Sequence, residues 1–271
     1  MLFELPDLIT LLQYALAGAA VGFVVGLTGV GGGSFMTPIL VSVFGVKMAV
    51  AVGTDLLYAA ITKANGVWVH KRQKTVEWPV VSLLAAGSLP ASVATVVFLS
   101  LLQQRGIDYA QYLTITLGVM LTLTAIVLLI RPWLVSERQI VAEELGTEKP
   151  SRKVAALTVV TGVALGILVT LSSVGAGAFG AAVLMVMYPR MPMIRVIGTD
   201  LAHAVPLTLI AGTGHMLHLG HVDFGLLLGL LIGSLPAIWL GTKLASRLPD
   251  AWIRPVMALI LLGLGIKYTV F

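Results

Sequence analysis

The chain has 271 residues, of which 58% are hydrophobic and only 11% are charged. A soluble domain carries about 25% charged residues, so this composition excludes a protein that faces water on all sides. Cysteine is absent, which excludes disulfides and thiolate metal ligands. The net charge of +5 does not indicate nucleic acid, because membrane proteins gather lysine and arginine in their cytoplasmic loops.

Long apolar runs follow one another along the chain. A helix needs roughly 20 apolar residues to cross the hydrocarbon core of a bilayer. Runs of about this length, nearly free of charge, occupy residues 8–28, 76–102, 109–130, 154–173, 224–245 and 252–266. The alternation of apolar and polar residues expected of a membrane barrel is missing. We therefore predict an all-α transmembrane protein, and expect the first span to be retained because no basic segment precedes it.

The second half of the sequence repeats the first at a spacing of 144 to 146 residues. GFVVGLTGVGGGSF matches GILVTLSSVGAGAF, VGTDL matches IGTDL, and VEWPVVSLLAAGSLPA matches VDFGLLLGLLIGSLPA. Three collinear matches predict two homologous halves, residues 1–130 and 154–271. The charged segment between them, residues 131–153, reads as a connector that contains a short surface helix from Ser136 to Leu145.

The orientation of the halves depends on two short apolar pieces, residues 34–44 and 178–188. If these pieces cross, each half has five elements and the second half is inverted. With an external N-terminus, that arrangement places 13 of the 17 basic residues inside, 3 outside and Lys63 within a helix. A parallel four-element arrangement gives 9 and 7. Because basic residues favour the cytoplasm, we predict inverted repeats and a cytoplasmic connector. Eleven residues rise only ~16 Å, so the short pieces are expected to be half-helices.

A glycine-rich break precedes each short piece. Inverted repeats with discontinuous helices are a recurring transporter plan, in which half-helix N-termini face anionic substrate groups. Glycine permits close backbone approach at such a break, although small residues also serve tight helix packing. The residues that we predict to contact substrate here are Gly31, Gly32, Gly33 and Ser34 in the first copy, and Ser173, Gly175 and Gly177 in the second.

The repeated tripeptide GTD forms the second motif. It supplies Thr54 and Asp55 in the first half and Thr199 and Asp200 in the second. Carboxylates within apolar segments are costly in lipid and indicate function, although a threonine or aspartate can also cap a helix. We predict that both threonines contact substrate and that both aspartates couple transport to an ion.

Two further ionisable residues follow these aspartates. Lys63 stands eight residues after Asp55 and so lies on the same helix face, where the two side chains could pair. His203 stands three residues after Asp200 and could carry protons, because histidine titrates near neutral pH. The alternative for His203 is a hydrogen-bonded histidine in the core.

The remaining motifs give no sign of a substrate or metal site. Trp68 and Trp78 bracket a basic turn and are typical of a membrane interface. His215, His218 and His221 read as surface histidines rather than a zinc site. There is neither a P-loop nor a GxSxG motif, so we expect no enzyme and no cofactor.

The blocks GLTGVGGGSFMTPIL and AVGTDLLYAAIT, the HKRQKTVEW turn that leads into a GSLP helix, and their degenerate second copies resemble the TauE/SafE family of sulfite exporters and anion permeases. The resemblance implies transport of a small sulfur-containing anion, such as sulfite, sulfoacetate or another sulfonate, across a bacterial inner membrane. Family members often carry serine where this chain has Asp55 and Asp200, which leaves the coupling ion open.

The expected function is therefore a proton-coupled secondary transporter for such an anion. The alternatives are a membrane-embedded binding or accessory subunit and a passive anion channel. The expected partners are the small anionic substrate and the lipid bilayer, with no nucleic acid. The sequence leaves the substrate's identity, the direction of transport and a homo-oligomeric state open.

Overall fold

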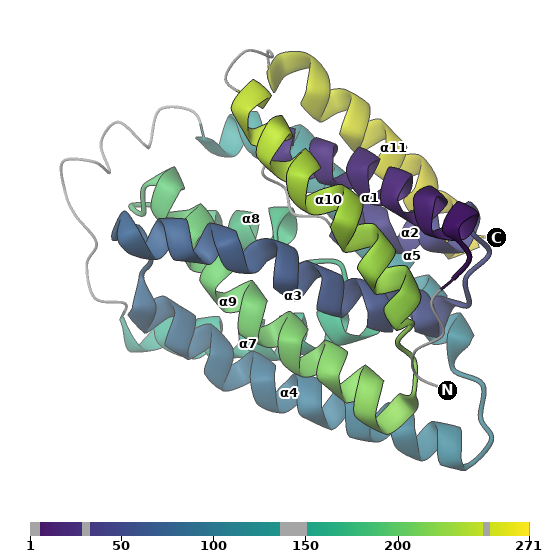
Figure 1. The fold of residues 1–271 in the computed structure, drawn as a ribbon. Coiled ribbons are helices and arrows are strands. Elements are labelled where there is room, and N and C mark those ends of the chain that lie inside the picture. The colour runs from purple at the N-terminus through teal and green to yellow at the C-terminus, as the bar shows by residue number, and fades with distance from the viewer. Residues whose placement is uncertain (1–5, 29–32, 136–150, 246–249, 271) are drawn as a thin grey trace.

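A computed structural model describes residues 6–28, 33–135, 151–245 and 250–270 (Figure 1). The first repeat contains helices α1 (Leu8–Thr28), α2 (Gly33–Ser42), α3 (Met48–Arg72), α4 (Trp78–Gln104) and α5 (Ala110–Val135). The second contains α7 (Arg152–Ser172), α8 (Ala178–Met187), α9 (Met193–Gly214), a π-helical turn (His215–Leu219), α10 (Phe224–Ala245) and α11 (Asp250–Val270). The described residues include no strand, which confirms the all-α prediction.

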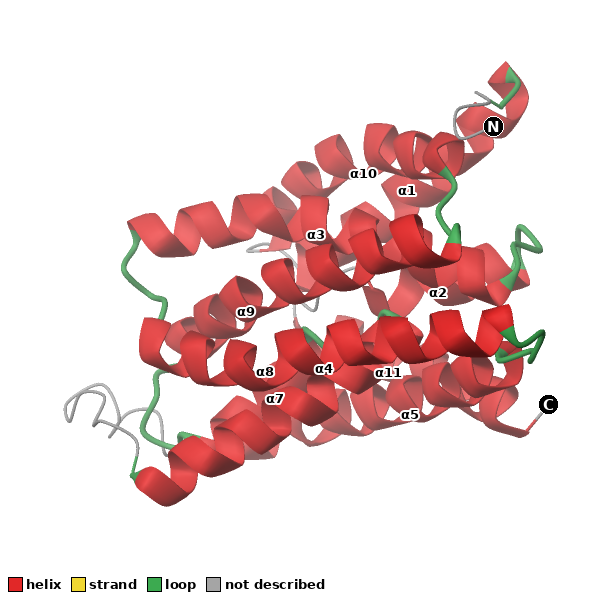
Figure 2. Cartoon of the chain, turned by 90° about the horizontal axis from the view of Figure 1, so that it is seen from below, coloured by secondary structure: helices red, strands yellow, loops and turns green. Residues whose placement is uncertain are grey.

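Six of the helices in the described ranges are long and apolar enough to cross a membrane: α1, α4, α5, α7, α10, and α9 together with its π-helical turn. Figure 2 shows the long helices lying side by side as one bundle. The sequence composition and this architecture define a multi-pass membrane protein. Helix α5 runs on to Val135, beyond the first-repeat boundary predicted at residue 130, and the predicted connector helix lies outside the described residues.

The two short pieces are short helices of 10 residues each, α2 and α8. At 1.5 Å per residue each rises about 15 Å, roughly half the hydrocarbon core. This length is the one expected of half-helices. The long helix α3 is different again, because its N-terminal half is almost wholly buried and it carries Asp55 and Lys63 in the interior.

The helices of the two repeats interlock in a reciprocal way. Helix α1 of the first repeat packs along α10 of the second, and α7 of the second packs along α4 of the first (Figure 1). The equivalent helices α3 and α9 pack on each other, as do α5 and α11. Each repeat thus completes its packing with helices of the other.

Glycines at matched positions allow these close approaches. A Cβ atom on Gly22 would lie 2.7 Å from the Cα of Ser234, and one on Gly166 would lie 2.9 Å from the Cα of Ser88. Ser234 and Ser88 are themselves equivalent, because they belong to the two GSLP motifs. These helical glycines therefore serve packing between α1 and α10 and between α7 and α4.

Candidate functional site

The second glycine-rich break separates α7 from α8 and has the backbone that glycine favours. Ser173 has a φ of 60° and ends α7, with its amide bonded to Val169 at 2.8 Å. Gly175 and Gly177 follow with φ values of 123° and 144°, which are strained for other residues. The amide of Gly180 bonds the carbonyl of Gly175 at 2.9 Å, so α8 begins directly after the break. The predicted helix break is confirmed in this repeat.

A lysine from the other repeat reaches this break. Lys63 Nζ on α3 donates a 2.6 Å hydrogen bond to the carbonyl oxygen of Ala176. Lys63 is only 5% exposed and is the one lysine or arginine classed as buried among the described residues. A buried cation is costly unless it is compensated, so its surroundings must supply negative charge.

Asp55 supplies part of that charge. Its side chain is fully buried, and the Thr37 hydroxyl on α2 donates to Asp55 Oδ2 at 2.5 Å. The other oxygen, Asp55 Oδ1, has no hydrogen-bond partner within the described residues. The Ser173 hydroxyl from the second break lies beside this carboxylate, within reach to donate to it.

Asp200 occupies the matched position in the second repeat but meets different neighbours. Its side chain is 3% exposed and lies against Gly180, in the first turn of α8, where any added Cβ would collide with Asp200 Oδ1. Each aspartate thus contacts the short helix of its own repeat.

Lys63 lies within electrostatic reach of both carboxylates. The sequence spacing allowed a direct pair between Asp55 and Lys63. In the structure Lys63 instead bonds a backbone carbonyl, and it acts on Asp200 as well. No ion pair within 4 Å joins it to either aspartate in the part of the chain described. Spacing along one helix could not reveal this, since the partners come from the break between α7 and α8 and from α9.

The two threonines of the GTD motifs make reciprocal contacts. The Asp223 amide donates to Thr54 Oγ1 at 3.0 Å, and the Glu77 amide donates to Thr199 Oγ1 at 3.0 Å. Asp223 and Glu77 are themselves equivalent and lie just before α10 and α4. Both hydroxyls therefore anchor the loop of the opposite repeat, and contact of either threonine with substrate stays a prediction.

His203 is fully buried on α9. Its Nε2 lies 2.8 Å from the Ser88 hydroxyl on α4, while Nδ1 has no partner within the described residues. The equivalent position in the first repeat is Tyr58, whose hydroxyl lies beside Ser234. The histidine is thus held in the core by one nitrogen, and its role in proton transfer stays a prediction.

The first break is only partly visible. Gly31 and Gly32 lie outside the described residues, Gly33 begins α2, and Ser34 is buried in its first turn. Sequence reasoning missed Thr37, because a single hydroxyl in an apolar helix gives no sign of its partner. It also missed the contact of Asp200 with Gly180 and the backbone acceptor of Lys63.

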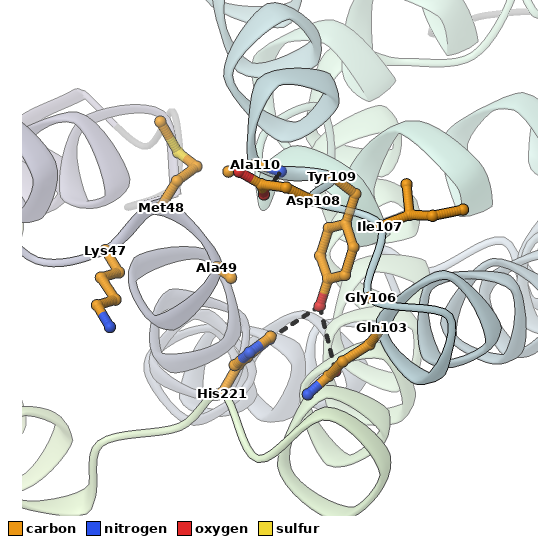
Figure 3. A pocket seen from close by; sticks show the side chains of 10 residues that line it. All are labelled: Lys47, Met48, Ala49, Gln103, Gly106, Ile107, Asp108, Tyr109, Ala110 and His221. Atoms are coloured by element: carbon orange, nitrogen blue, oxygen red, sulfur yellow. Dashed lines mark hydrogen bonds between the residues drawn. The ribbon is translucent and has the colours of Figure 1, made fainter.

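A separate cavity of about 530 Å³ opens at one end of the bundle, where the α2–α3 turn, the α4–α5 turn and the loop before α10 meet (Figure 3). The Tyr109 hydroxyl lies 3.2 Å from His221 Nδ1 and donates at 3.4 Å to Gln103. Burial, and then the charge of Lys47, lower the pKa of His221. His215 instead donates through Nε2 to the Thr170 carbonyl at 3.0 Å, so these two histidines serve different contacts.

A bundle of membrane-length helices, interrupted by half-helices and containing buried charges at the interruption, defines the class of multi-pass membrane transport proteins. Comparison with known proteins supports this class. The family model described as "Sulfite exporter TauE/SafE" matches residues 14–268. The chain belongs to the TauE/SafE family, as its motifs suggested.

Curated relatives carry names of the same class. "Probable membrane transporter protein YjnA" of Bacillus subtilis (strain 168) is 37% identical over 93% of this chain and 97% of its own length. "Probable membrane transporter protein YdhB" of the same organism is 27% identical over 88% of this chain and 91% of its own. A "Probable membrane transporter protein" of Xylella fastidiosa (strain Temecula1 / ATCC 700964) is 26% identical over 92% and 91%. No solved structure matches the chain significantly.

Proposed function

We propose that this protein is a secondary transporter that moves a small sulfur-containing anion, such as sulfite, sulfoacetate or another sulfonate, together with a proton across the bacterial inner membrane. The observation that carries the proposal is the buried Lys63 ammonium, which lies against the break between α7 and α8. Family membership supports the class of transporter.

The proposed anion site lies between Lys63 and the N-terminus of α8. An ammonium group has three donors, and the described bond to Ala176 uses one of them. The first amides of a helix have no intrahelical acceptor, and the helix dipole there favours negative charge. Sulfite and sulfonates carry three oxygen atoms that such donors suit. Ser173, Gly175 and Gly177 would line this site, with Gly31, Gly32, Gly33 and Ser34 in the corresponding part of the first repeat.

The position of Asp200 supports the proposed proton coupling. Its carboxylate lies at the first turn of α8, beside the place where the anion would bind. An ionised Asp200 would repel the anion, whereas a protonated Asp200 would not. Binding of the anion and protonation of Asp200 therefore favour each other. His203, one turn further along α9, is the proposed exchange partner for that proton.

The proposed orientation is an inverted pair of repeats with the N-terminus outside and the connector in the cytoplasm. The reciprocal packing of α1 on α10 and of α7 on α4 supports a two-fold relation between the repeats. An odd number of crossing elements in each repeat would turn that relation into an inverted one.

Reconstitution into liposomes tests the proposal. Uptake of radiolabelled sulfite should require the protein, saturate, and respond to a pH gradient. Lys63→Met should lower uptake at least about tenfold, since hydrogen bonds to charged groups contribute about 1.5–3 kcal/mol. Lys243→Met is the matched control, because that exposed lysine lies over the Trp239 ring on α10. An accessory subunit would give no flux, and a passive channel would give flux that ignores the pH gradient.

A further inference from the structure

The cavity at the end of the bundle is separate from the proposed anion site at the start of α8. It has a volume of about 530 Å³ and lies where the α2–α3 turn, the end of α4 and the loop before α10 meet (Figure 3). Three of its lining side chains carry nitrogen: Lys47, Gln103 and His221. Each comes from a different one of these segments, so this end cavity gathers hydrogen-bonding groups from three parts of the chain.

The positive charge of the end cavity comes from Lys47, which is the one lysine or arginine among its lining residues. No carboxylate forms an ion pair with Lys47 within 4 Å in the part of the chain that the structure describes. Its charge acts on His221, whose pKa is lowered first by burial and then by Lys47. The side of the cavity formed by these two residues therefore has a positive potential.

The carboxylate that lines the end cavity belongs to Asp108 and already serves a helix. Asp108 Oδ1 accepts a 2.9 Å hydrogen bond from the Ala110 amide in the first turn of α5. The positive end of the helix dipole partly balances the charge of such a cap. Burial, and then the charge of Asp108, raise the pKa of Tyr109, whereas the charge that acts on His221 is that of Lys47. An anion in the cavity would therefore bind on the side of Lys47 and His221.

The ring of His221 is held at one nitrogen only. The Tyr109 hydroxyl lies 3.2 Å from Nδ1, while Nε2 makes no hydrogen bond among the described residues. A protonated Nε2 can donate to an anion. Tyr109 thus fixes the ring and leaves its other nitrogen for a ligand.

The loop that carries His221 is in contact with the helix that carries the central charges. A Cβ atom added to Gly53 would lie 2.0 Å from the His221 carbonyl oxygen, so the loop packs directly on α3. Gly53 stands two residues before Asp55 on that helix. One wall of the end cavity is therefore continuous with the segment of α3 that leads to Asp55 and Lys63.

The matched positions of the other repeat lack these nitrogen atoms. Pro192 corresponds to Lys47, and Thr75 corresponds to His221. The opposite end of the bundle, which is built on the same plan, therefore has no equivalent pair. This difference argues that Lys47 and His221 serve more than the packing that both repeats share.

We infer that the end cavity is an entry site, where Lys47 and His221 bind a small sulfonate anion before it reaches Lys63. An organic anion suits the cavity better than an inorganic one, because apolar side chains also line it, those of Met48, Ala49 and Ile107. The inference rests on the proposed function and names the place where the substrate first binds.

Labelling of single cysteines tests the inference, because the chain has no cysteine of its own. Ile107→Cys places a thiol in the end cavity, where Ile107 is 45% exposed, and Gln104→Cys places one nearby but outside the lining residues. The purified full-length protein is treated with an anionic thiosulfonate reagent that carries a sulfonate group, or with its cationic trimethylammonium counterpart. The ratio of the anionic to the cationic rate should be on the order of fivefold higher at position 107, because Lys47 attracts one reagent and repels the other.

Two lysine variants in the Ile107→Cys protein identify the charge responsible. Lys47→Met should reduce the ratio to its value at position 104. Lys267→Met is the matched control, because this exposed lysine lies over the Tyr268 ring near Ser42, at the same end of the bundle, and does not line the cavity. Sulfoacetate should slow labelling at position 107 in a saturable way and leave position 104 unchanged. Equal ratios at the two positions, no effect of Lys47→Met, or no protection by sulfoacetate would overturn the inference.

Uptake into proteoliposomes separates this inference from the proposed function. Lys47→Met should raise the sulfoacetate concentration for half-maximal uptake by about fivefold and leave the maximal rate nearly unchanged. Wild-type uptake without the labelling pattern removes only this inference. The labelling pattern without any uptake removes the proposed function, and with it the role of the cavity as an entrance, while the anion site stands.

Discussion

Asp55 and Asp200 occupy matched positions in the two repeats, but their surroundings differ. Asp55 accepts a hydrogen bond from Thr37 and lies beside the Ser173 hydroxyl, whereas Asp200 lies against the backbone of Gly180. Thr37 corresponds to Ala181 in the second repeat, so the difference lies in a few side chains on a shared backbone plan. The first carboxylate is held by a hydroxyl donor, whereas the second lies against the backbone of a glycine.

The two repeats also differ at the positions of Lys63 and His203. Lys63 corresponds to Thr208, and His203 corresponds to Tyr58. The first repeat therefore supplies a buried lysine, and the second supplies a buried histidine. The two repeats share one backbone plan, and these substitutions give the two carboxylates different neighbours.

The largest expected contrast concerns the orientation of the repeats. The chain has no cysteine, so single cysteines at Glu4 and Glu144 can report on the two sides of the membrane. An impermeant thiol reagent added outside intact cells should label position 4 and leave position 144 unlabelled. Cells opened by detergent provide the control for accessibility. Labelling of both positions would show that the repeats are not inverted.

The next largest expected effect is a difference in thermal stability between variants of the two aspartates. Asp55→Asn weakens a buried hydrogen bond to a charged group, a contribution of about 1.5–3 kcal/mol, and should lower the melting temperature by about 5 °C. Asp200→Asn should lower it less, because Asp200 lies against Gly180 rather than a hydroxyl donor. Thermal unfolding in detergent measures both variants. Equal losses would contradict the idea that the first carboxylate is fixed and the second is not.

A smaller effect is expected from Gly180→Ala. The added methyl group would displace the Asp200 carboxylate from the first turn of α8, and uptake should fall roughly tenfold for a loss near 1.4 kcal/mol. Gly263→Ala is the control, because a Cβ at that position in α11 meets nothing within 4 Å. Initial rates in proteoliposomes measure both. If a folded Gly180→Ala protein transports at the wild-type rate, Asp200 does not belong to the proposed substrate site.

Much of the fold could be predicted from the sequence. Apolar runs of membrane length and the repeat at 144 to 146 residues indicated helices in two related halves. The positive φ values of Gly175 and Gly177 confirm the second break, because only a few residue types adopt such a backbone. These features are local, and local patterns suffice to reveal them.

The partners of the buried side chains could not be predicted in the same way. Lys63 bonds the carbonyl of Ala176, which lies 113 residues away, and backbone acceptors leave no trace in residue identity. The interlocking of the repeats likewise depends on surfaces of α1 and α10 that are far apart in sequence. Symmetry could have suggested the reciprocal contacts of Thr54 and Thr199, since each motif recurs with the loop that it anchors.

The pH profile of uptake tests most directly whether Asp200 carries the coupled proton. Initial rates of sulfoacetate uptake are measured in proteoliposomes of the wild type and of Asp200→Asn, with the external pH varied near neutrality and the internal pH fixed, because the charge of this sulfonate does not change in that range. Wild-type uptake should rise as the external pH falls, because protonation of Asp200 removes a charge that repels the anion. Asp200→Asn should still bind and exchange sulfoacetate but show a flat profile. An unchanged pH dependence in that variant would place the proton elsewhere and contradict the account.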